Sequence, residues 1–313
     1  MGKRDLTSRA SQADLPQAAR PAFELKERKL KKLLRGLGGA AVAFSGGVDS
    51  TYLAAVCAET LPGRCVVVTG RSASFPARER EAAEATARQL NLRHILIDSE
   101  ELDIPEFSSN PPNRCYLCKR ELFAKIKLAA AQAGLPHVVE ASNVDDEVDF
   151  RPGLQALAEL GILSPLRQAN LTKDDIRQLS KARGLATWDK PSFACLASRF
   201  PYGERITPER LGKVDLAETF LLSLGLRQVR VRFHDHGDLA RIETDDEGLA
   251  LLTTPAVRPL VAKRFLELGF TYTAADLAGY RTGSMNASLT AVERKASSPG
   301  PPQLSVAFRG RPI

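Results

Sequence analysis

Short apolar runs alternate with longer helix-forming segments through the first half of the chain. The apolar runs are rich in valine, isoleucine and alanine, which is typical of strands buried on both faces of a sheet, and they cover residues 39–44, 64–70, 94–99 and 137–142. The segments beside them have helical periodicity or strong helix formers and cover residues 23–37, 48–60, 76–90 and 118–134. Regular alternation of this kind predicts an α/β fold, in which a parallel sheet has helices on both of its faces.

The pattern changes near residue 200. Residues 188–210 are irregular and contain three prolines, and a connection of that length is often functional. A helix is expected from about Pro208, and residues 228–244 read as two strands around a glycine-containing turn. A further helix over 256–269 and a strand over 270–277 follow. These elements predict a smaller α+β domain in the C-terminal part of the chain.

We therefore expect two domains between two tails. The α/β domain should cover residues 23–200, and its "TKDD" segment at 172–175 matches a capping box that opens one more helix. The smaller domain, expected to serve the substrate and oligomer assembly, should cover 201–286. Residues 1–22 are polar and residues 287–313 are rich in proline and serine, so both are predicted to be disordered.

Charge and composition narrow the class of partner. The net charge of +7 favours anionic partners such as nucleotides, phosphorylated metabolites or RNA. No apolar run approaches the ~20 residues that span a bilayer, and the first residues, "MGKRDLTSRASQADLPQ", lack the apolar core of a secretory signal. We expect a cytoplasmic protein with no membrane partner, whose five cysteines are reduced thiols or metal ligands.

A turn rich in glycine and serine, "SGGVDS", connects the first predicted strand to the next helix. Gly46 and Gly47 let the backbone turn sharply and approach a ligand, and a helix N-terminus suits an anion. Ser45 and Ser50 add hydroxyl donors, and Asp49 suits a Mg²⁺ ion that bridges to phosphate oxygens. The segment lacks the lysine of a Walker A loop and the spacing of a dinucleotide fingerprint. A tight turn without a ligand is the alternative.

The five cysteines fall into two groups. Cys57 lies inside a predicted helix and Cys65 starts a strand, and both are expected to be small buried apolar side chains. Cys115 and Cys118 start a predicted helix and precede two cationic residues, a position expected to lower the thiol pKa and favour thiolates. Cys195 lies in the irregular loop close to an arginine and is a candidate nucleophile.

Three cysteines in two segments leave several kinds of site open. A dithiol switch needs only two thiols, and a zinc site needs a fourth ligand. An iron–sulfur cluster normally uses four thiolates, so three would leave one iron open to a ligand such as sulfide. We favour a cluster held by Cys115, Cys118 and Cys195. The alternative is three unliganded thiols, of which only Cys195 reacts.

Alternation in the segment "QVRVRFHD" indicates a strand with one basic face. Arg230 and Arg232 should lie on that face, with Val229, Val231 and Phe233 on the other. Paired guanidinium groups suit a nucleotide phosphate or a carboxylate, and the alternative is a solvated strand face.

Four more side chains are candidates because of their position. Asn143 and Asp146 follow the fourth predicted strand, at the edge where ligands of open α/β sheets bind. Ser198 and Arg199 follow Cys195 closely and could orient a substrate or a thiolate.

Several stretches together resemble one known family. "SGGVDS" is similar to the PP-loop of the ATP pyrophosphatases. Six more stretches complete a resemblance to the LarE family of sulfur transferases over about residues 25–286, namely "NPPNRCYLCK", "SNVDDEVDFRPG", "LSPL", "KPSFACLASRFPYGERIT", "VRVRFHDHGDLARIE" and "GYRTGSMN". One segment departs from the family, because "EASN" at residues 140–143 stands where a "DGTN"-like sequence is usual.

The resemblance implies a substrate and a reaction. ATP and Mg²⁺ would adenylylate a carboxylate of pyridinium-3,5-biscarboxylic acid mononucleotide with release of pyrophosphate, and a sulfur nucleophile would displace AMP to leave a thiocarboxylate for the nickel-pincer nucleotide. The loop would hold the pyrophosphate, and adenine would lie near Ser72 after the second strand. Arg230 and Arg232 would bind the substrate phosphate, and Glu218 would be a catalytic residue. The family also implies a homo-oligomer such as a hexamer.

The cysteine count separates two types within that family. Members with one cysteine, matching Cys195, lose its sulfur, whereas members with three hold a 4Fe-4S cluster, and this chain resembles the second type. A tRNA-thiolating enzyme is the alternative, although no RNA-binding appendage or lysine-rich face indicates a nucleic-acid partner. A non-catalytic nucleotide or metal sensor is a third interpretation. An amide-forming ligase would need a glutaminase domain and would leave the cysteines idle.

Overall fold

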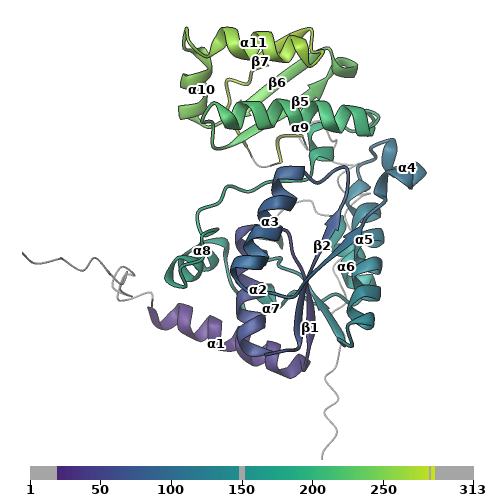
Figure 1. Cartoon of the computed structure of the whole chain (residues 1–313), viewed down its shortest axis with the longest axis vertical. Coiled ribbons are helices and arrows are strands. Elements are labelled where there is room, and N and C mark those ends of the chain that lie inside the picture. The colour runs from purple at the N-terminus through teal and green to yellow at the C-terminus, as the bar shows by residue number, and fades with distance from the viewer. Residues whose placement is uncertain (1–19, 148–151, 282, 286–313) are drawn as a thin grey trace, which may run out of the picture.

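The computed structural model describes residues 20–147, 152–281 and 283–285. Within them the chain forms a larger α/β body and a smaller α+β body, stacked along the long axis (Figure 1). The larger body is built on a parallel four-stranded sheet in the order β3-β2-β1-β4. Its strands are β1 (Ala40–Ala43), β2 (Cys65–Arg71), β3 (His94–Asp98) and β4 (His137–Val139).

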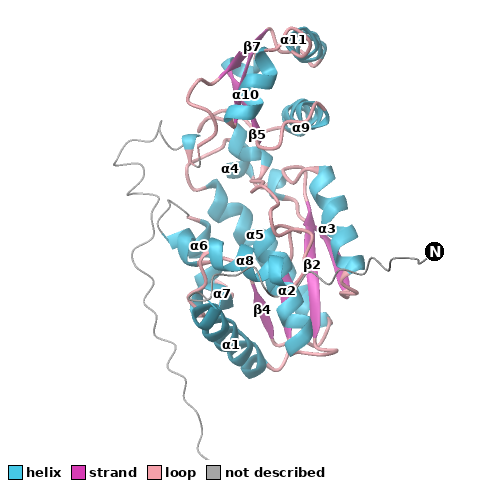
Figure 2. Cartoon of the chain, turned by 90° about the vertical axis from the view of Figure 1, so that its left-hand side faces the viewer, coloured by secondary structure: helices cyan, strands magenta, loops and turns pink. Residues whose placement is uncertain are grey.

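Helices cover both faces of this sheet, as predicted (Figures 1 and 2). Successive strand residues belong to two apolar clusters on opposite faces of the sheet. Val67 belongs to the cluster that contains Leu30 and Tyr52, and Val66 belongs to the cluster that contains Phe123. Burial on both faces explains why the strands read as continuous apolar runs. The helices are α1 (Arg20–Leu37), α2 (Val48–Thr60), α3 (Ala77–Gln89), α4 (Pro105–Ser108), α5 (Arg114–Gln132), α6 (Gly153–Glu159), α7 (Pro165–Gln168) and α8 (Lys173–Ala182).

The smaller body has a three-stranded sheet in the order β5-β6-β7, with β5 and β6 antiparallel and β6 and β7 parallel. Its elements are α9 (Pro208–Ser223), β5 (Val229–His234), β6 (Leu239–Thr244), α10 (Asp246–Thr253), α11 (Arg258–Glu267) and β7 (Tyr272–Ala275). Helices α9 and α11 lie on one side of the sheet (Figure 2), where Val231 and Phe233 share an apolar cluster with Val214 and Phe265. The other face is left for the polar side chains of β5.

The turn between β5 and β6 needs its glycine. Gly237 has a φ of 109°, and a Cβ on it would lie 2.6 Å from the ring of Phe233. Both the left-handed backbone and the close approach exclude other residues at this position. The predicted hairpin around a glycine-containing turn is therefore confirmed.

The structure differs from the sequence prediction at several element ends. Strands β4 and β7 are only three and four residues long, so the predicted strands over 137–142 and 270–277 were too long. Helix α1 begins at Arg20, within the predicted tail, and α10 was not predicted. Residues 1–19 and 287–313 lie outside the described residues, so the predicted tails stay predictions there.

The irregular segment after Trp188 joins the two bodies. A short 3-10 helix, η4 (Leu196–Arg199), places Leu196 and Ala197 in the apolar core of the smaller body, together with Phe107 from α4. The core of the smaller body thus includes side chains that precede residue 200 in the sequence. None of the helices in the three described ranges is both long enough and apolar enough to cross a membrane.

Candidate functional site

The glycine- and serine-rich turn packs tightly against α3. Gly46 has a φ of 67°, and a Cβ there would lie 2.7 Å from the Cα of Ala83. The hydroxyls of Ser45 and Ser50 are 3.1 Å apart, and the hydroxyl of Ser50 also donates to the carbonyl of Gly47 at 3.3 Å. The loop is therefore held in a fixed shape at the N-terminus of α2, which is the arrangement expected for an anion site.

Asp49 pairs with a lysine and lies in the electrostatic field of a second carboxylate. One of its oxygens is paired with Lys173, and the other is buried without a hydrogen-bond partner. Burial raises the pKa of Asp49, Lys173 opposes that rise, and the charge of Asp146 adds to it, so the two carboxylates lie in each other's field. An unpartnered carboxylate oxygen beside a second carboxylate fits a Mg²⁺ ion.

The segment after β4 brings Asp146 to this position. The backbone N–H of Asn143 donates to the Asp146 carboxylate at 2.9 Å. Glu140, in the segment that departs from the family, is buried and accepts from both the backbone and the hydroxyl of Ser142, at 3.0 and 2.7 Å, and from the hydroxyl of Ser164. Glu140 therefore fixes the turn that carries Asn143 and Asp146.

The loop after β2 is joined to the cysteine-bearing loop. The hydroxyls of Ser72 and Ser74 are 3.0 Å apart, and the carbonyl of Ser74 accepts from the backbone N–H of Leu196 at 2.8 Å. The side chain of Ser74 also hydrogen-bonds Cys195 and lowers the pKa of its thiol. The predicted adenine-side residue Ser72 and the predicted nucleophile Cys195 thus belong to one connected region.

The three candidate cysteines share an electrostatic environment. The pKa of Cys118 is raised well above its usual value, by burial first and then by Cys195, Glu101 and Cys115. Burial also raises the pKa of the Cys195 thiol. A hydrogen bond with the side chain of Ser74 opposes this rise, and the charge of Cys115 adds to it. The prediction that the helix N-terminus favours a thiolate was therefore wrong for Cys118, because burial outweighs the local effect.

The five cysteines differ in their exposure. Cys115 and Cys195 are exposed as residues, although burial of the Cys195 thiol raises its pKa. In the described ranges no three His, Cys, Asp or Glu side chains are arranged to hold a metal ion. Cys57 is buried in the core, and Cys65 is half-buried beside it and hydrogen-bonded to it. Their predicted apolar role agrees with this packing.

Arg199 and Glu218 form a buried support beneath the cysteine-bearing loop. Arg199 donates to Glu218 at 2.7 and 2.9 Å, to the carbonyls of Ala194 and Cys195 at 2.9 and 3.2 Å, and to the hydroxyl of Ser198 at 2.9 Å. Burial alone would raise the pKa of Glu218, but Arg199 holds it below its usual value. The guanidinium contacts the Cys195 backbone rather than its thiol, which indicates a positioning role.

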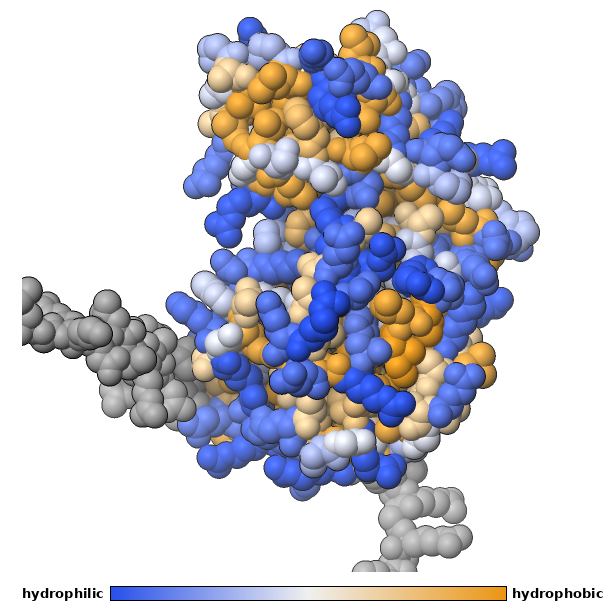
Figure 3. Space-filling view, viewed as in Figure 1, coloured by the Kyte–Doolittle hydropathy of each residue, from blue (hydrophilic) through white to orange (hydrophobic). Residues whose placement is uncertain are grey.

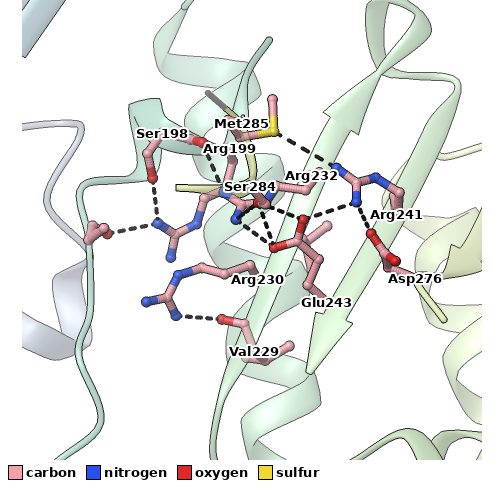
Figure 4. A network of polar contacts seen from close by, with 12 residues as sticks. Ser198, Arg199, Val229, Arg230, Arg232, Arg241, Glu243, Asp276, Ser284 and Met285 are labelled. Carbon is pink, nitrogen blue, oxygen red and sulfur yellow. Dashed lines mark hydrogen bonds and ion pairs between the residues drawn. The ribbon is translucent and has the colours of Figure 1, made fainter. Parts of the chain in front are cut away.

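Arg230 lies on the polar face of β5 with Arg232, and the predicted alternation of this strand is confirmed by the burial of Val229, Val231 and Phe233 opposite them. Figure 4 shows both guanidinium groups in the network between η4 and the smaller sheet. Neither arginine is solvated, since their exposed fractions are 2% and 5%. The alternative of a solvated strand face was therefore wrong.

The two arginines differ in how their charge is balanced. Arg232 pairs with Glu243 at 2.6 Å and donates to the hydroxyl of Ser284 at 2.8 Å and the carbonyl of Ser198 at 3.0 Å. Within the part of the chain that the structure describes, Arg230 donates hydrogen bonds to backbone carbonyls, including that of Val229 at 2.8 Å. Burial and the nearby positive charge of Arg199 lower the pKa of Arg230 to about 10. This concentration of positive charge suits an anionic ligand group.

Several contacting residues were missed by sequence reasoning. Lys173 pairs with Asp49, Lys190 donates to the carbonyl of Gly46 at 3.2 Å, and Arg78 pairs with Glu218 at 3.1 Å. The sequence signal for the two lysines was their position: Lys173 lies in the predicted capping box, and Lys190 lies in the irregular loop. A separate open hollow contains none of the predicted site residues and is lined by Pro191, Arg227, Gln228, Asp245, Asp246 and Glu247.

Comparison with known proteins places the chain in a family. The asparagine synthase family model matches residues 26–108, which include the phosphate loop. A protein of Synechocystis sp. is 40% identical over 268 residues, 86% of this chain and 99% of that protein. A protein of Methanocaldococcus jannaschii is 30% identical over 259 residues, 82% of this chain and 94% of that protein.

One relative with a stated activity aligns over nearly its whole length. Pyridinium-3,5-bisthiocarboxylic acid mononucleotide synthase of Lactiplantibacillus plantarum is 35% identical over 269 residues, 85% of this chain and 95% of that enzyme. The matched length includes both bodies described above. The chain belongs to the LarE family of PP-loop sulfur transferases.

Proposed function

We propose that this enzyme uses ATP to convert a carboxylate of pyridinium-3,5-biscarboxylic acid mononucleotide to a thiocarboxylate, a step toward the nickel-pincer nucleotide. The observation that carries the proposal is the connection between three parts of the site. Ser74 links the loop after β2 to Cys195, and Arg232 on the basic face of the smaller sheet donates to the carbonyl of Ser198 in the Cys195 loop. Its family relative in Lactiplantibacillus plantarum is named for the bisthiocarboxylic product.

The nucleotide would bind at the phosphate loop. Ser45, Gly46, Gly47 and Ser50 would hold the pyrophosphate part of ATP through backbone N–H groups and hydroxyls. Asp49 would hold Mg²⁺ together with Asp146. Two observations support this, because one oxygen of Asp49 has no hydrogen-bond partner and the charge of Asp146 raises the pKa of Asp49. Ser72 and Asn143, at the ends of neighbouring strands, would contact the nucleoside part.

The substrate would lie between the loop and the smaller sheet. Arg230 and Arg232 would bind its phosphate, and the carboxylate would attack the α-phosphorus of ATP, so that pyrophosphate leaves and an acyl-adenylate forms. A sulfur nucleophile would then attack the acyl carbon and displace AMP. Glu218, Arg199 and Ser198 would hold the Cys195 loop in place for this second step.

We further propose that Cys115, Cys118 and Cys195 hold a 4Fe-4S cluster, which supplies sulfide for the transfer when it is bound. The donor chemistry supports this, because thiols suit an iron–sulfur cluster better than a harder ion, and the three cysteines influence one another's pKa. The alternative is that Cys195 itself gives up its sulfur by β-elimination and becomes dehydroalanine. Anaerobic purification with iron and sulfide analysis decides between them, with Cys115→Ala as the matched variant expected to lose the iron.

The overall reaction has its own test. AMP and pyrophosphate should form only when the pyridinium mononucleotide and ATP are both present. ATP cleavage without that substrate would contradict the proposal, and salt-dependent binding of tRNA with ATP cleavage in its presence would favour a tRNA-thiolating enzyme instead.

We also propose a cytoplasmic homo-oligomer. All five cysteines are free thiols, which suits a reducing compartment. Hydrophobic surface gathers on the smaller body in Figure 3, and its exposed large side chains include Leu260, Leu266, Tyr272 and Leu277. A surface of this kind favours self-association. Light scattering on the purified protein tests it, and a monomer at micromolar concentration would contradict it.

A further inference from the structure

Two lysines from other segments of the chain contact the glycine- and serine-rich turn. Lys173 is the first residue of α8 and pairs with Asp49 of the turn. Lys190 lies in the irregular loop, donates to the carbonyl of Gly46 at 3.2 Å and pairs with the buried Glu79 at 2.8 Å. Both ammonium groups thus contact the loop itself, although the lysines lie more than a hundred residues away from it in the sequence.

Arg177 connects the two segments that carry these lysines. It follows Lys173 by one helical turn, so both side chains lie on the same face of α8. Its guanidinium donates to the carbonyls of Trp188 and Lys190, at 2.8 and 3.0 Å, and its charge also reaches Asp49. The segment that carries Lys190 is therefore fixed to the helix that carries Lys173.

The N-terminus of α8 is itself well defined. Thr172 and Asp175 form a reciprocal capping box, and Ile176 and Leu179 pack in the core of the larger body. Lys173 therefore projects from a rigid position rather than from a loose loop.

The charge of the expected leaving group requires cations at this place. Pyrophosphate carries roughly three negative charges near neutral pH, whereas the turn offers backbone N–H groups, hydroxyls and one carboxylate of the same sign as the ligand. The turn also lacks the lysine that a Walker A loop would supply. Positive charge must then come from a metal ion and from side chains outside the turn.

We infer that Lys173 and Lys190 are pyrophosphate-binding residues, and that Lys173 pairs with Asp49 until Mg²⁺ takes that carboxylate. Lys173 then turns to the phosphate oxygens, and Lys190 holds the other side of the same group. The inference rests on the proposed function and deepens it, because it assigns the residues that stabilise the departing pyrophosphate.

The test measures pyrophosphate binding in the absence of the pyridinium substrate, so it is independent of the overall reaction. Trp188 is the single tryptophan of the chain, and its carbonyl is held by Arg177, so its fluorescence reports on this region. Pyrophosphate with Mg²⁺ is titrated into wild type, Lys173→Met and Lys190→Met, and calorimetry repeats each titration. Lys125→Met, which removes a lysine of α5 that pairs with Glu100 and Glu121, is the matched control.

Each loop-facing variant should bind pyrophosphate about 10- to 100-fold more weakly, as expected for the loss of one charge-assisted contact, and the control should not change. Binding of Mn²⁺ alone is measured by electron paramagnetic resonance. Mn²⁺ should bind Lys173→Met at least as tightly as wild type, because the lysine that competes with the metal ion for Asp49 is absent. Unchanged pyrophosphate affinity in Lys173→Met and Lys190→Met would overturn the inference. Weaker Mn²⁺ binding in Lys173→Met would overturn the exchange at Asp49. If wild-type protein binds pyrophosphate but forms no AMP with ATP and the pyridinium substrate, that result would count against the proposed function alone.

Discussion

Arg199 and Glu218 are joined by two hydrogen bonds, of 2.7 and 2.9 Å, and both side chains are completely buried. The pair lies between the Cys195 loop and β5, because Glu218 also accepts from the backbone N–H of Val231 at 3.0 Å. A buried charge pair is sensitive to the loss of one partner, since the other charge is left in a medium of low polarity.

Glu218→Gln should therefore destabilise the protein by about 3–5 kcal/mol, as expected for one uncompensated buried charge. The free energy of unfolding in urea measures this. The double variant Arg199→Met with Glu218→Gln should recover part of the loss, because it removes both charges. Glu267→Gln, in an exposed pair with Arg264, serves as the control and should change stability by less than about 1 kcal/mol. A Glu218→Gln protein as stable as that control would refute the structural role.

Cys195→Ala should separate the two half-reactions. Pyrophosphate release with ATP and the pyridinium substrate should continue at a rate within about tenfold of wild type, whereas thiocarboxylate formation, followed by mass spectrometry, should be lost. The reason is that the phosphate loop and Asp49 do not depend on the thiol. Cys65→Ser, in the core pair with Cys57, is the control and should retain both steps.

The raised thiol pKa values predict a pH dependence. In metal-free protein, Cys195 should be alkylated slowly by iodoacetamide at neutral pH, and its rate should rise with a midpoint above that of the same cysteine in the unfolded chain, because only the thiolate reacts. Ser74→Ala removes a hydrogen bond that lowers this pKa, so its midpoint should move further up. A midpoint lower than in the unfolded chain would show that positive charge outweighs burial around this thiol.

Arg230→Met should weaken substrate binding selectively. Its guanidinium is buried, donates to backbone carbonyls and lies over the rings of Phe193 and Tyr280. Within the described residues no carboxylate accepts a hydrogen bond from it, so an anion is its natural partner. The KM for the pyridinium mononucleotide should rise by about 10- to 100-fold, while the KM for ATP changes little. Arg227→Met, an exposed arginine near the start of the same strand, is the matched control. An equal rise in both KM values would point to a folding defect, which thermal unfolding of the variant would reveal.

The periodic features of the chain were predictable from the sequence, and the long-range contacts were not. Helix α2 was predicted with its observed bounds, Val48–Thr60, because a glycine pair and helix formers mark its start and course. The alternation of β5 gave the side on which Arg230 lies, since a strand has a fixed period of two residues. The burial of Arg230 depends on contacts with Ser192, Phe193 and Tyr280, which lie far from it in the sequence, and no local pattern reports such contacts.

The same distinction applies to the site chemistry. The position of Cys118 at a helix start could be predicted, but its raised pKa follows from burial and from neighbours such as Cys195, which come together only in the folded chain. Lys173 was missed because its partner, Asp49, is 124 residues away and no spacing rule links them. Ion pairs of this kind carry no periodic signal.

The hydrogen bond from the backbone of Leu196 to the carbonyl of Ser74 has a chemical consequence. An acyl-adenylate is a mixed anhydride that water destroys, so an enzyme that makes one gains from having the next reactant already beside it. The strand end proposed to face the nucleotide and the thiol-bearing loop are joined by this hydrogen bond. In the proposed reaction, activation of the acid and its capture by sulfur would therefore take place at one site, and the reactive anhydride would not have to diffuse.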